Sequence, residues 1–221
     1  VTLGQYFTPD RIKDFMLDIL EPKIGNLIID PAFGSGGFLV FAYRRLLESI
    51  KRSGFNTEKI EQEKQKLASD YIYGTEITAR LALACKTNMY LHGDGRTHIY
   101  RHDGLVNFGD IFEDKFDIVI TNPPFGAPID KRDILDNYQL GLKRRSQQSN
   151  VLFLERCVRL AKKGTGRIGI VLPESILMNT TYKYVRDWLD QNATVDAIFK
   201  MPSYAFKPSG TSGISTSLVF L

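Results

Sequence analysis

The chain of 221 residues is 43% hydrophobic and 24% charged, which is typical of one globular domain, 1–221, with a full core. Its two cysteines, Cys85 and Cys157, lie far apart inside helix-like patterns, which excludes a disulfide framework and predicts no metal site. The apolar runs are too short to span a bilayer and the N-terminus lacks a signal peptide, so we expect a soluble, cytoplasmic protein with no membrane partner.

The ends and the charge of the chain qualify these expectations. The sequence starts at Val1 and stops on the apolar run TSLVFL, so we expect a fragment of a longer protein. A net charge of +4 permits contact with phosphates without establishing it. Basic residues gather at 142–150 and 155–167, and the second cluster fits a solvated helix face equally well. The polar loop at 142–150 is therefore the better candidate for phosphate contact.

Short apolar runs alternate with longer helical patterns along the chain. In chain order, the sequence predicts a helix at 9–20, a strand at 26–30, a helix at 38–52, an exposed inserted helix at 53–69, a strand at 71–76, a helix at 77–92, strands at 98–103 and 116–121, a helix at 150–163, a strand at 167–173, a helix at 181–191, and strands at 195–200 and 216–221. The strands are continuously apolar rather than alternating, which predicts an open, mostly parallel α/β sheet with helices on both faces.

The first helix has an apolar face that should pack on the sheet. It is predicted to consist of Ile12, Phe15, Met16, Ile19 and Leu20.

In such sheets ligands bind beyond the carboxyl ends of the strands, and the first strand ends at Asp30. The following loop, DPAFGSGGF (30–38), contains Gly34, Gly36 and Gly37, which permit tight turning and close approach of the backbone to a ligand. The spacing differs from G-x-G-x-x-G because the third glycine comes one position too early, and no P-loop Lys-Ser/Thr pair follows. An acid at the strand end suits a ligand with an ammonium group better than a pyrophosphate.

Two more acids follow strands. Glu76, in YGTEI, has the chemistry to accept hydrogen bonds from both hydroxyls of a ribose, and it fits equally well as a favourable charge at a helix N-terminus. Asp103, in RHDGL, could accept from an adenine amine or simply form a turn.

The fourth strand is followed by TNPPF, with Asn122, Pro123, Pro124 and Phe125. Two consecutive prolines donate no backbone hydrogen bond and fix their own φ angles, so they make a stiff element at the strand end. Alone, this tetrapeptide fits a turn capped by a core aromatic as well as it fits a functional site.

The ordered set GQYFTP (4–9), DPAFGSGGF, YGTE, HDGL and NPPF resembles the amino-group DNA methyltransferases that make N6-methyladenine from S-adenosylmethionine. It is most similar to the modification subunit of type I restriction-modification systems. The resemblance runs from Gly4 to the final strand, and its specificity comes from the joint occurrence of the motifs. It implies the Rossmann-like fold of class I S-adenosylmethionine-dependent methyltransferases. Phe33 stands where the family often carries a smaller Cys.

The resemblance also implies roles for individual residues. The pocket for the cofactor's methionine end would be lined by Tyr6, Phe7 and Thr8, with Thr8 able to hydrogen-bond a carboxylate. Asp30 would face the ammonium group. The remaining cofactor-binding residues would be Pro31, Gly34, Gly36, Gly37 and Phe38 in the glycine loop, Glu76 at the ribose hydroxyls, and Asp103 with Leu105 at the adenine.

In this interpretation NPPF is a rigid clamp for the target amine. The Asn122 side-chain oxygen and the Pro123 carbonyl would accept its two N–H bonds, Pro124 would stiffen the clamp, and Phe125 would stack on the flipped base. The implied partners are double-stranded DNA with a flipped adenine, a separate specificity subunit and a restriction subunit. Alternatives left open are methylation of RNA or of protein glutamine, an inactive cofactor- or DNA-binding subunit, and a nucleotide-binding dehydrogenase, which the glycine spacing disfavours.

Overall fold

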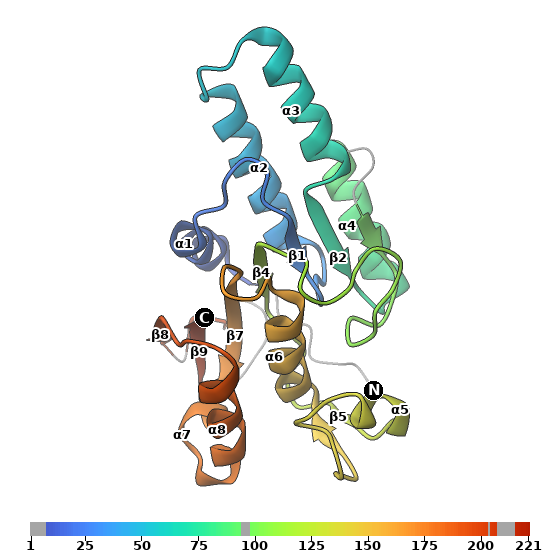
Figure 1. The fold of residues 1–221 in the computed structure, drawn as a ribbon, viewed down its shortest axis with the longest axis vertical. Helices are drawn as coiled ribbons and strands as arrows, with labels where there is room; N and C mark the ends of the chain where they lie inside the picture. The colour runs from blue at the N-terminus through green and yellow to red at the C-terminus, as the bar shows by residue number, and fades with distance from the viewer. Residues whose placement is uncertain (1–7, 94–97, 203, 207–214) are drawn as a thin grey trace.

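The computed structural model describes residues 8–93, 98–202, 204–206 and 215–221. Within them lies a seven-stranded sheet of order β3-β2-β1-β4-β7-β9-β8 (Figure 1). Neighbours from β3 to β7 are parallel, and β9 runs antiparallel to both β7 and β8. The strands are β1 (Ile28–Asp30), β2 (Ile72–Thr75), β3 (His98–Tyr100), β4 (Ile118–Thr121), β7 (Arg167–Pro173), β8 (Ala197–Lys200) and β9 (Thr216–Phe220). The predicted fold class is confirmed.

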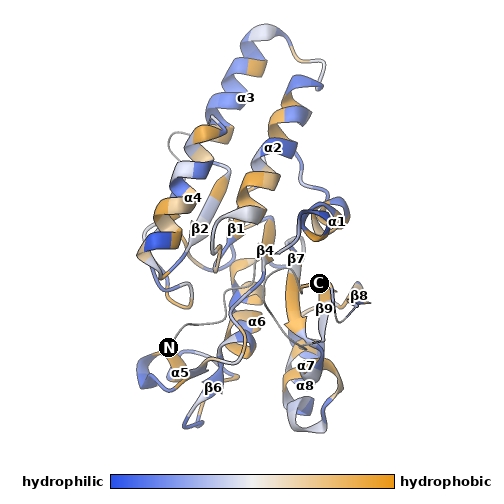
Figure 2. Cartoon of the chain, turned by 180° about the vertical axis from the view of Figure 1, so that it is seen from behind, coloured by the Kyte–Doolittle hydropathy of each residue, from blue (hydrophilic) through white to orange (hydrophobic). Residues whose placement is uncertain are grey.

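Helices cover both faces of this sheet. The helices are α1 (Asp10–Leu20), α2 (Gly37–Lys51), α3 (Thr57–Ser69), α4 (Ala79–Leu91), α5 (Arg132–Asp136), α6 (Ser149–Leu160), α7 (Glu174–Met178) and α8 (Lys183–Asn192), with a 3-10 turn η1 (Thr180–Tyr182). One core cluster joins α1, α2 and α4 to the sheet, and a second joins α6, α7 and α8 to the opposite face (Figure 2).

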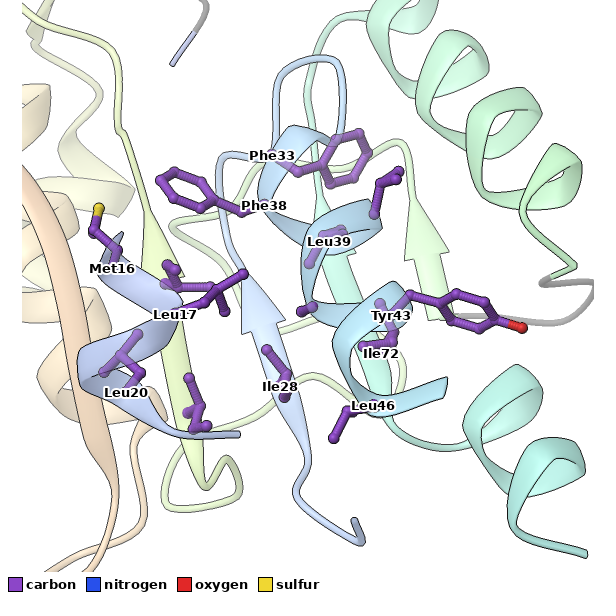
Figure 3. Close-up of a cluster of buried hydrophobic side chains, with 14 of the residues drawn as sticks. Met16, Leu17, Leu20, Ile28, Phe33, Phe38, Leu39, Tyr43, Leu46 and Ile72 are labelled. Atoms are coloured by element: carbon purple, nitrogen blue, oxygen red, sulfur yellow. The ribbon is translucent and has the colours of Figure 1, made fainter. Parts of the chain in front are cut away.

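Consecutive strand residues belong to different clusters because side chains alternate across a strand. Ile28 is in the first cluster and its neighbour Ile29 is in the second, and both are fully buried. Figure 3 shows the first cluster, which includes Met16, Leu17 and Leu20 of α1 together with Ile28 of β1. Burial on both faces explains why the strands read as continuous apolar runs.

The face of α1 differs from the predicted one. Phe15 is 38% exposed and meets Phe199 of the edge strand β8 edge to face, whereas Lys13 and Leu17 are buried. The helix is therefore rotated by roughly one position relative to the predicted stripe. A lysine occupies a position that the apolar pattern treats as solvent-facing.

The inserted segment forms α3, which lies alongside α2 and extends away from the sheet (Figure 1). The Asn56 side chain accepts a hydrogen bond from the Lys59 N–H at 2.8 Å and caps the helix. Most of α3 faces solvent, but Leu67 is buried and Glu63 accepts a hydrogen bond from the Tyr71 hydroxyl at 2.6 Å. These contacts fasten the base of the helix to the domain.

The topology determines where a ligand can enter. The chain runs outward from β1 to β2 and β3, then returns to β4 on the other side of β1. Loops after β1 and β4 therefore leave the sheet in opposite directions, which opens a crevice at their carboxyl ends. The loops that contain Asp30, Glu76, Asp103 and Asn122 all leave from this edge.

The segment 126–150, for which the sequence predicts no strand, contains a small two-stranded sheet of β5 (Pro128–Ile129) and β6 (Gln147–Gln148) on either side of α5. Strands of two residues are too short to show a periodic pattern, so sequence analysis missed them. Among the described residues, no helix combines the length and the apolar character needed to cross a bilayer.

Candidate active site

A pocket of about 350 Å³ opens at the carboxyl ends of β1, β2 and β4. Its wall contains most of the described residues that the sequence singled out: Thr8, Asp30, Pro31, Gly34, Gly37, Phe38, Glu76, Asp103, Leu105, Asn122, Pro123 and Pro124. Gly36 and Phe125 do not form part of this wall, and Tyr6 and Phe7 lie outside the described residues. Phe125 is half-buried and packs against the first core cluster.

The glycine loop turns in a conformation that favours glycine. Gly34 and Gly36 have φ values of +56° and +84°, in the left-handed region. A Cβ on Gly36 would lie 2.2 Å from the Cys85 sulfur of α4, so the loop packs directly on that helix. Gly37 is the first residue of α2, and a Cβ there would meet the Lys13 ammonium nitrogen at 3.1 Å.

Asp30 is a buried acid at the end of β1, 1% exposed. Burial raises its pKa to about 7, and the charge of nearby Glu76 acts in the same direction. The Ala32 N–H donates to Asp30 Oδ1 at 3.0 Å, which opposes the shift. No lysine, arginine or histidine of the described residues forms an ion pair with Asp30, so its charge is available to a cationic ligand.

The Glu76 carboxylate is fixed by two backbone amides. Gly34 N–H donates to Oε2 at 3.1 Å and Thr78 N–H donates to Oε1 at 2.8 Å. Each oxygen keeps a second acceptor site, so the carboxylate is oriented and still able to accept from a ligand. Glu76 therefore ties the glycine loop to the end of β2 as well as facing the pocket.

Asp103 is held in the same manner. Its Oδ1 accepts from the Leu105 N–H at 3.0 Å, which is the turn predicted as one of its two roles. A Cβ on Gly104 would lie 1.9 Å from the Pro31 carbonyl oxygen, so this loop and the glycine loop are in direct backbone contact. The two loops together form one side of the pocket.

The side-chain amide of Asn122 lines the pocket, and among the described residues only its nitrogen has a hydrogen-bond partner. Its Nδ2 donates to Thr8 Oγ1 at 3.1 Å. Its Oδ1 is buried and has no hydrogen-bond partner among the described residues. A buried acceptor without a donor is costly, so an oxygen left in this state beside a pocket indicates a ligand donor. Ser149 Oγ donates to the Pro124 carbonyl at 2.7 Å and fixes the proline turn.

Sequence analysis missed several residues of the wall, among them Lys13, Ile129, Lys131, Ile134, Ser149 and Phe153. Lys13 is buried, pairs with exposed Asp10 at 2.7 Å and lies 4.3 Å from the centre of the Phe41 ring. The apolar pattern of the helix placed Lys13 toward solvent, so the sequence offered no signal for it. The others lie in or after the segment 126–150, whose short strands escaped prediction. Within the described residues, no cluster of His, Cys, Asp and Glu could hold a metal ion.

Comparisons with known proteins agree with this geometry. The profile of the N-6 DNA Methylase family matches residues 2–221. The type I restriction enzyme EcoEI methylase subunit of Escherichia coli is 30% identical over 98% of this chain and 42% of its own length. The RM.BcgI type II restriction enzyme and methyltransferase of Heyndrickxia coagulans is 25% identical over 80% of this chain and 24% of its own.

Solved structures give the same result. A chain from a study of complex assembly and conformational transition of the type I R-M system superposes with a TM-score of 0.79 at 30% identity, covering 98% of this chain and 42% of its own. A type I restriction-modification methyltransferase subunit from Streptococcus thermophilus has a TM-score of 0.76 at 22% identity, covering 100% and 45%, which supports the fold alone.

This chain spans less than half the length of these relatives. The match nevertheless extends over nearly all of its own residues and includes every motif that suggested the resemblance. The predicted relationship is confirmed, and the chain belongs to the N-6 DNA Methylase family.

Proposed function

We propose that this chain transfers a methyl group from S-adenosylmethionine to the exocyclic amine of adenine in DNA, as the catalytic domain of a restriction-modification methyltransferase. The observation that carries the proposal is the buried, unpartnered Oδ1 of Asn122 at the pocket wall. The family membership and the similarity to methylase subunits support it.

The pocket residues fit this cofactor. Asp30 would hold its ammonium group, Glu76 its ribose hydroxyls and Asp103 its adenine amine. Each acid is already oriented by a backbone N–H from its own or a neighbouring loop, so little ordering remains for the bound state. These acids also suit the positive charge of a sulfonium ligand.

Lys13 supplies the complementary charge for the cofactor's carboxylate. Its ammonium lies against Gly37 at the N-terminus of α2, where the helix dipole is itself positive. Two positive groups placed together favour an anion between them. Thr8, which the sequence assigned to this carboxylate, accepts a hydrogen bond from Asn122 and keeps its hydroxyl hydrogen for a ligand, so it would serve the clamp and the carboxylate together.

When bound, the cofactor supplies a methyl group activated by its sulfonium charge. The chain's own contribution is to orient the nucleophile. An adenine amine is a weak nucleophile because its lone pair is delocalised into the ring. Asn122 Oδ1 and the Pro123 carbonyl would accept its two N–H bonds and so favour a more pyramidal, electron-rich nitrogen. Proline rigidity and the Ser149 hydrogen bond hold these acceptors in place before the reaction.

The target base must leave the duplex to reach Asn122, since the amine is inaccessible inside the stack. Stacking on Phe125 would partly offset the few kcal/mol of lost pairing and stacking. In the described structure Phe125 packs against the core, so this role requires its ring to turn toward the pocket.

We further propose that a separate specificity subunit reads the DNA sequence and that a restriction subunit completes the assembly. The basic segment 142–150 would contact phosphates, which position a protein without reading sequence. An enzyme with this substrate would act in the cytoplasm.

The test is to incubate the full-length protein, with any specificity partner, with radiolabelled S-adenosylmethionine and DNA, RNA or a glutamine-containing peptide in separate reactions. We expect label on DNA, recovered as N6-methyladenine after digestion. Label on RNA or peptide alone would replace the substrate in the proposal. No label despite measurable cofactor binding would favour an inactive binding subunit.

A further inference from the structure

Helix α6 contacts both halves of the pocket with one face. Ser149 at its first turn donates to the Pro124 carbonyl of the clamp. Arg156 lies seven residues later, two helical turns or about 10 Å along the same face. It contacts the loop that follows β3, which contains Asp103 and Leu105. Figure 1 shows α6 beside β7, in the lower half of the view.

The contacts of Arg156 are directed at one loop. Its Nε donates to the Gly104 carbonyl at 3.0 Å, one Nη to Asn107 Oδ1 at 2.8 Å and the other to the Val106 carbonyl at 3.3 Å. The three donors thus hold Gly104, Val106 and Asn107 of this loop. On the opposite side, the same loop abuts Pro31 of the glycine loop.

Burial of Arg156 costs free energy, because its charged guanidinium is removed from water. The side chain is 1% exposed, and no carboxylate of the described residues forms an ion pair with it. Burial accordingly lowers the pKa of its guanidinium. Because an apolar side chain would fill the same space without the desolvation cost, the retained charge indicates a positional role.

Two neighbouring residues reinforce the same loop and the segment after the clamp. The Tyr138 hydroxyl donates to the Leu105 carbonyl at 2.5 Å. Glu155, adjacent to Arg156 in α6, accepts from the backbone N–H groups of Gln139 and Leu140 at 2.9 and 2.8 Å. The segment 126–150 and the cofactor loop are therefore both fastened to α6.

We propose that α6 is the positioning helix of the site, with Arg156 holding the loop that receives the cofactor's adenine and Ser149 holding the clamp that receives the target amine. The proposal rests on the proposed function. It assigns different kinetic roles to two side chains on one helix face. Arg156 should act on cofactor affinity, and Ser149 should act on the rate of transfer.

The experiment compares Arg156→Met and Ser149→Ala in the full-length protein. Calorimetry gives the Kd for S-adenosylmethionine, and methyl transfer to DNA gives kcat at saturating cofactor. We expect Arg156→Met to raise Kd at least tenfold while kcat stays within about threefold. We expect Ser149→Ala to lower kcat about tenfold or more while Kd changes less than twofold.

Arg167→Met is the matched control. Arg167 also donates to two backbone carbonyls, of Leu20 and Ile19 at 3.0 and 2.6 Å, but it does so at the start of β7, at the opposite end of the sheet from the pocket. Its loss should lower the melting temperature and leave Kd and kcat unchanged. A purely structural role for Arg156 would give the same pattern.

Tyr138→Phe keeps the experiment decisive if Arg156→Met does not fold. It removes one hydroxyl bond to the same loop and should raise Kd about threefold. The proposal would be overturned if Arg156→Met and Tyr138→Phe left the affinity for S-adenosylmethionine unchanged. It would also be overturned if both α6 variants lost affinity and kcat to the same extent. A wild-type protein that binds no S-adenosylmethionine would instead refute the proposed function.

Discussion

The two halves of the pocket differ in how their acceptors are satisfied. On the cofactor side, Asp30, Glu76 and Asp103 each accept a backbone N–H within the loops that contain them. On the proposed target side, Asn122 Oδ1 accepts no hydrogen bond from any described residue. The acids of the proposed cofactor half are thus oriented by backbone N–H groups. The proposed target half contains a buried acceptor with no donor among the described residues. In the proposed function the target amine would supply the missing donor, so that binding of the base would engage the catalytic acceptor directly.

We expect the largest effect at Asp30, because this buried acid destabilises the folded protein when no ligand is bound. Its pKa is about 7 in the folded protein against 3.8 for a free aspartate side chain. Well below pH 3.8 the group is neutral in both states and does not change the free energy of unfolding. As the pH rises to 7 the unfolded chain ionises first, so the free energy of unfolding falls by up to about 4 kcal/mol.

Asp30→Asn should remove this dependence. Without cofactor, the variant should be more stable than the wild type at pH 8, and this difference should shrink to about 1 kcal/mol at pH 4.5, as measured by urea denaturation across that range. The wild-type affinity for S-adenosylmethionine should increase with pH up to about 7, because binding requires the ionised carboxylate. Identical pH profiles for the two proteins would mean that Asp30 is not a strained, ligand-seeking acid.

Asn122→Ala tests the opposite half. Loss of one preorganised acceptor for the target amine should cost roughly 3 kcal/mol, or a hundredfold or more in transfer rate. Cofactor affinity measured by calorimetry should not change, since the partner of Asn122 is Thr8 rather than a cofactor-side loop. Thr8→Val is the companion variant, with a smaller effect of the same kind on the transfer rate. Turnover close to wild type would remove Asn122 from the mechanism.

The contrast between the halves also explains what the sequence could predict. Asp30, Glu76 and Asp103 follow parallel strands directly, so the order of elements alone places them on one edge of the sheet. Thr8 and Asn122 are 114 residues apart, and Arg156 is 52 residues from Gly104. No local pattern encodes such pairings. Lys13 was missed for a related reason, because the apolar spacing of α1 is satisfied about equally by two adjacent rotations of the helix.

Glu76→Gln should weaken cofactor binding by about 2 kcal/mol, or roughly thirtyfold in Kd. The amide that replaces one oxygen would set an N–H against either the Gly34 or the Thr78 N–H, so the glycine loop would loosen as well. Calorimetry with Glu48→Gln as control separates this from a general charge effect, since Glu48 of α2 is exposed and pairs with Arg52, the residue after the helix. An equal, small change in both variants would return Glu76 to the role of a helix N-terminal charge.

Lys13→Met should have the smallest effect, about 1 kcal/mol or fivefold in Kd, because its ammonium already shares its charge with Asp10 and the Phe41 ring. The loss must be specific for one group of the ligand. S-adenosylmethionine should bind the variant about fivefold more weakly, while the decarboxylated cofactor should bind wild type and variant alike. Methionine keeps most of the aliphatic volume that packs on Gly37, so the comparison isolates the charge. If both ligands lose affinity equally, Lys13 only shapes the wall, and the carboxylate must be held by other groups at the start of α2.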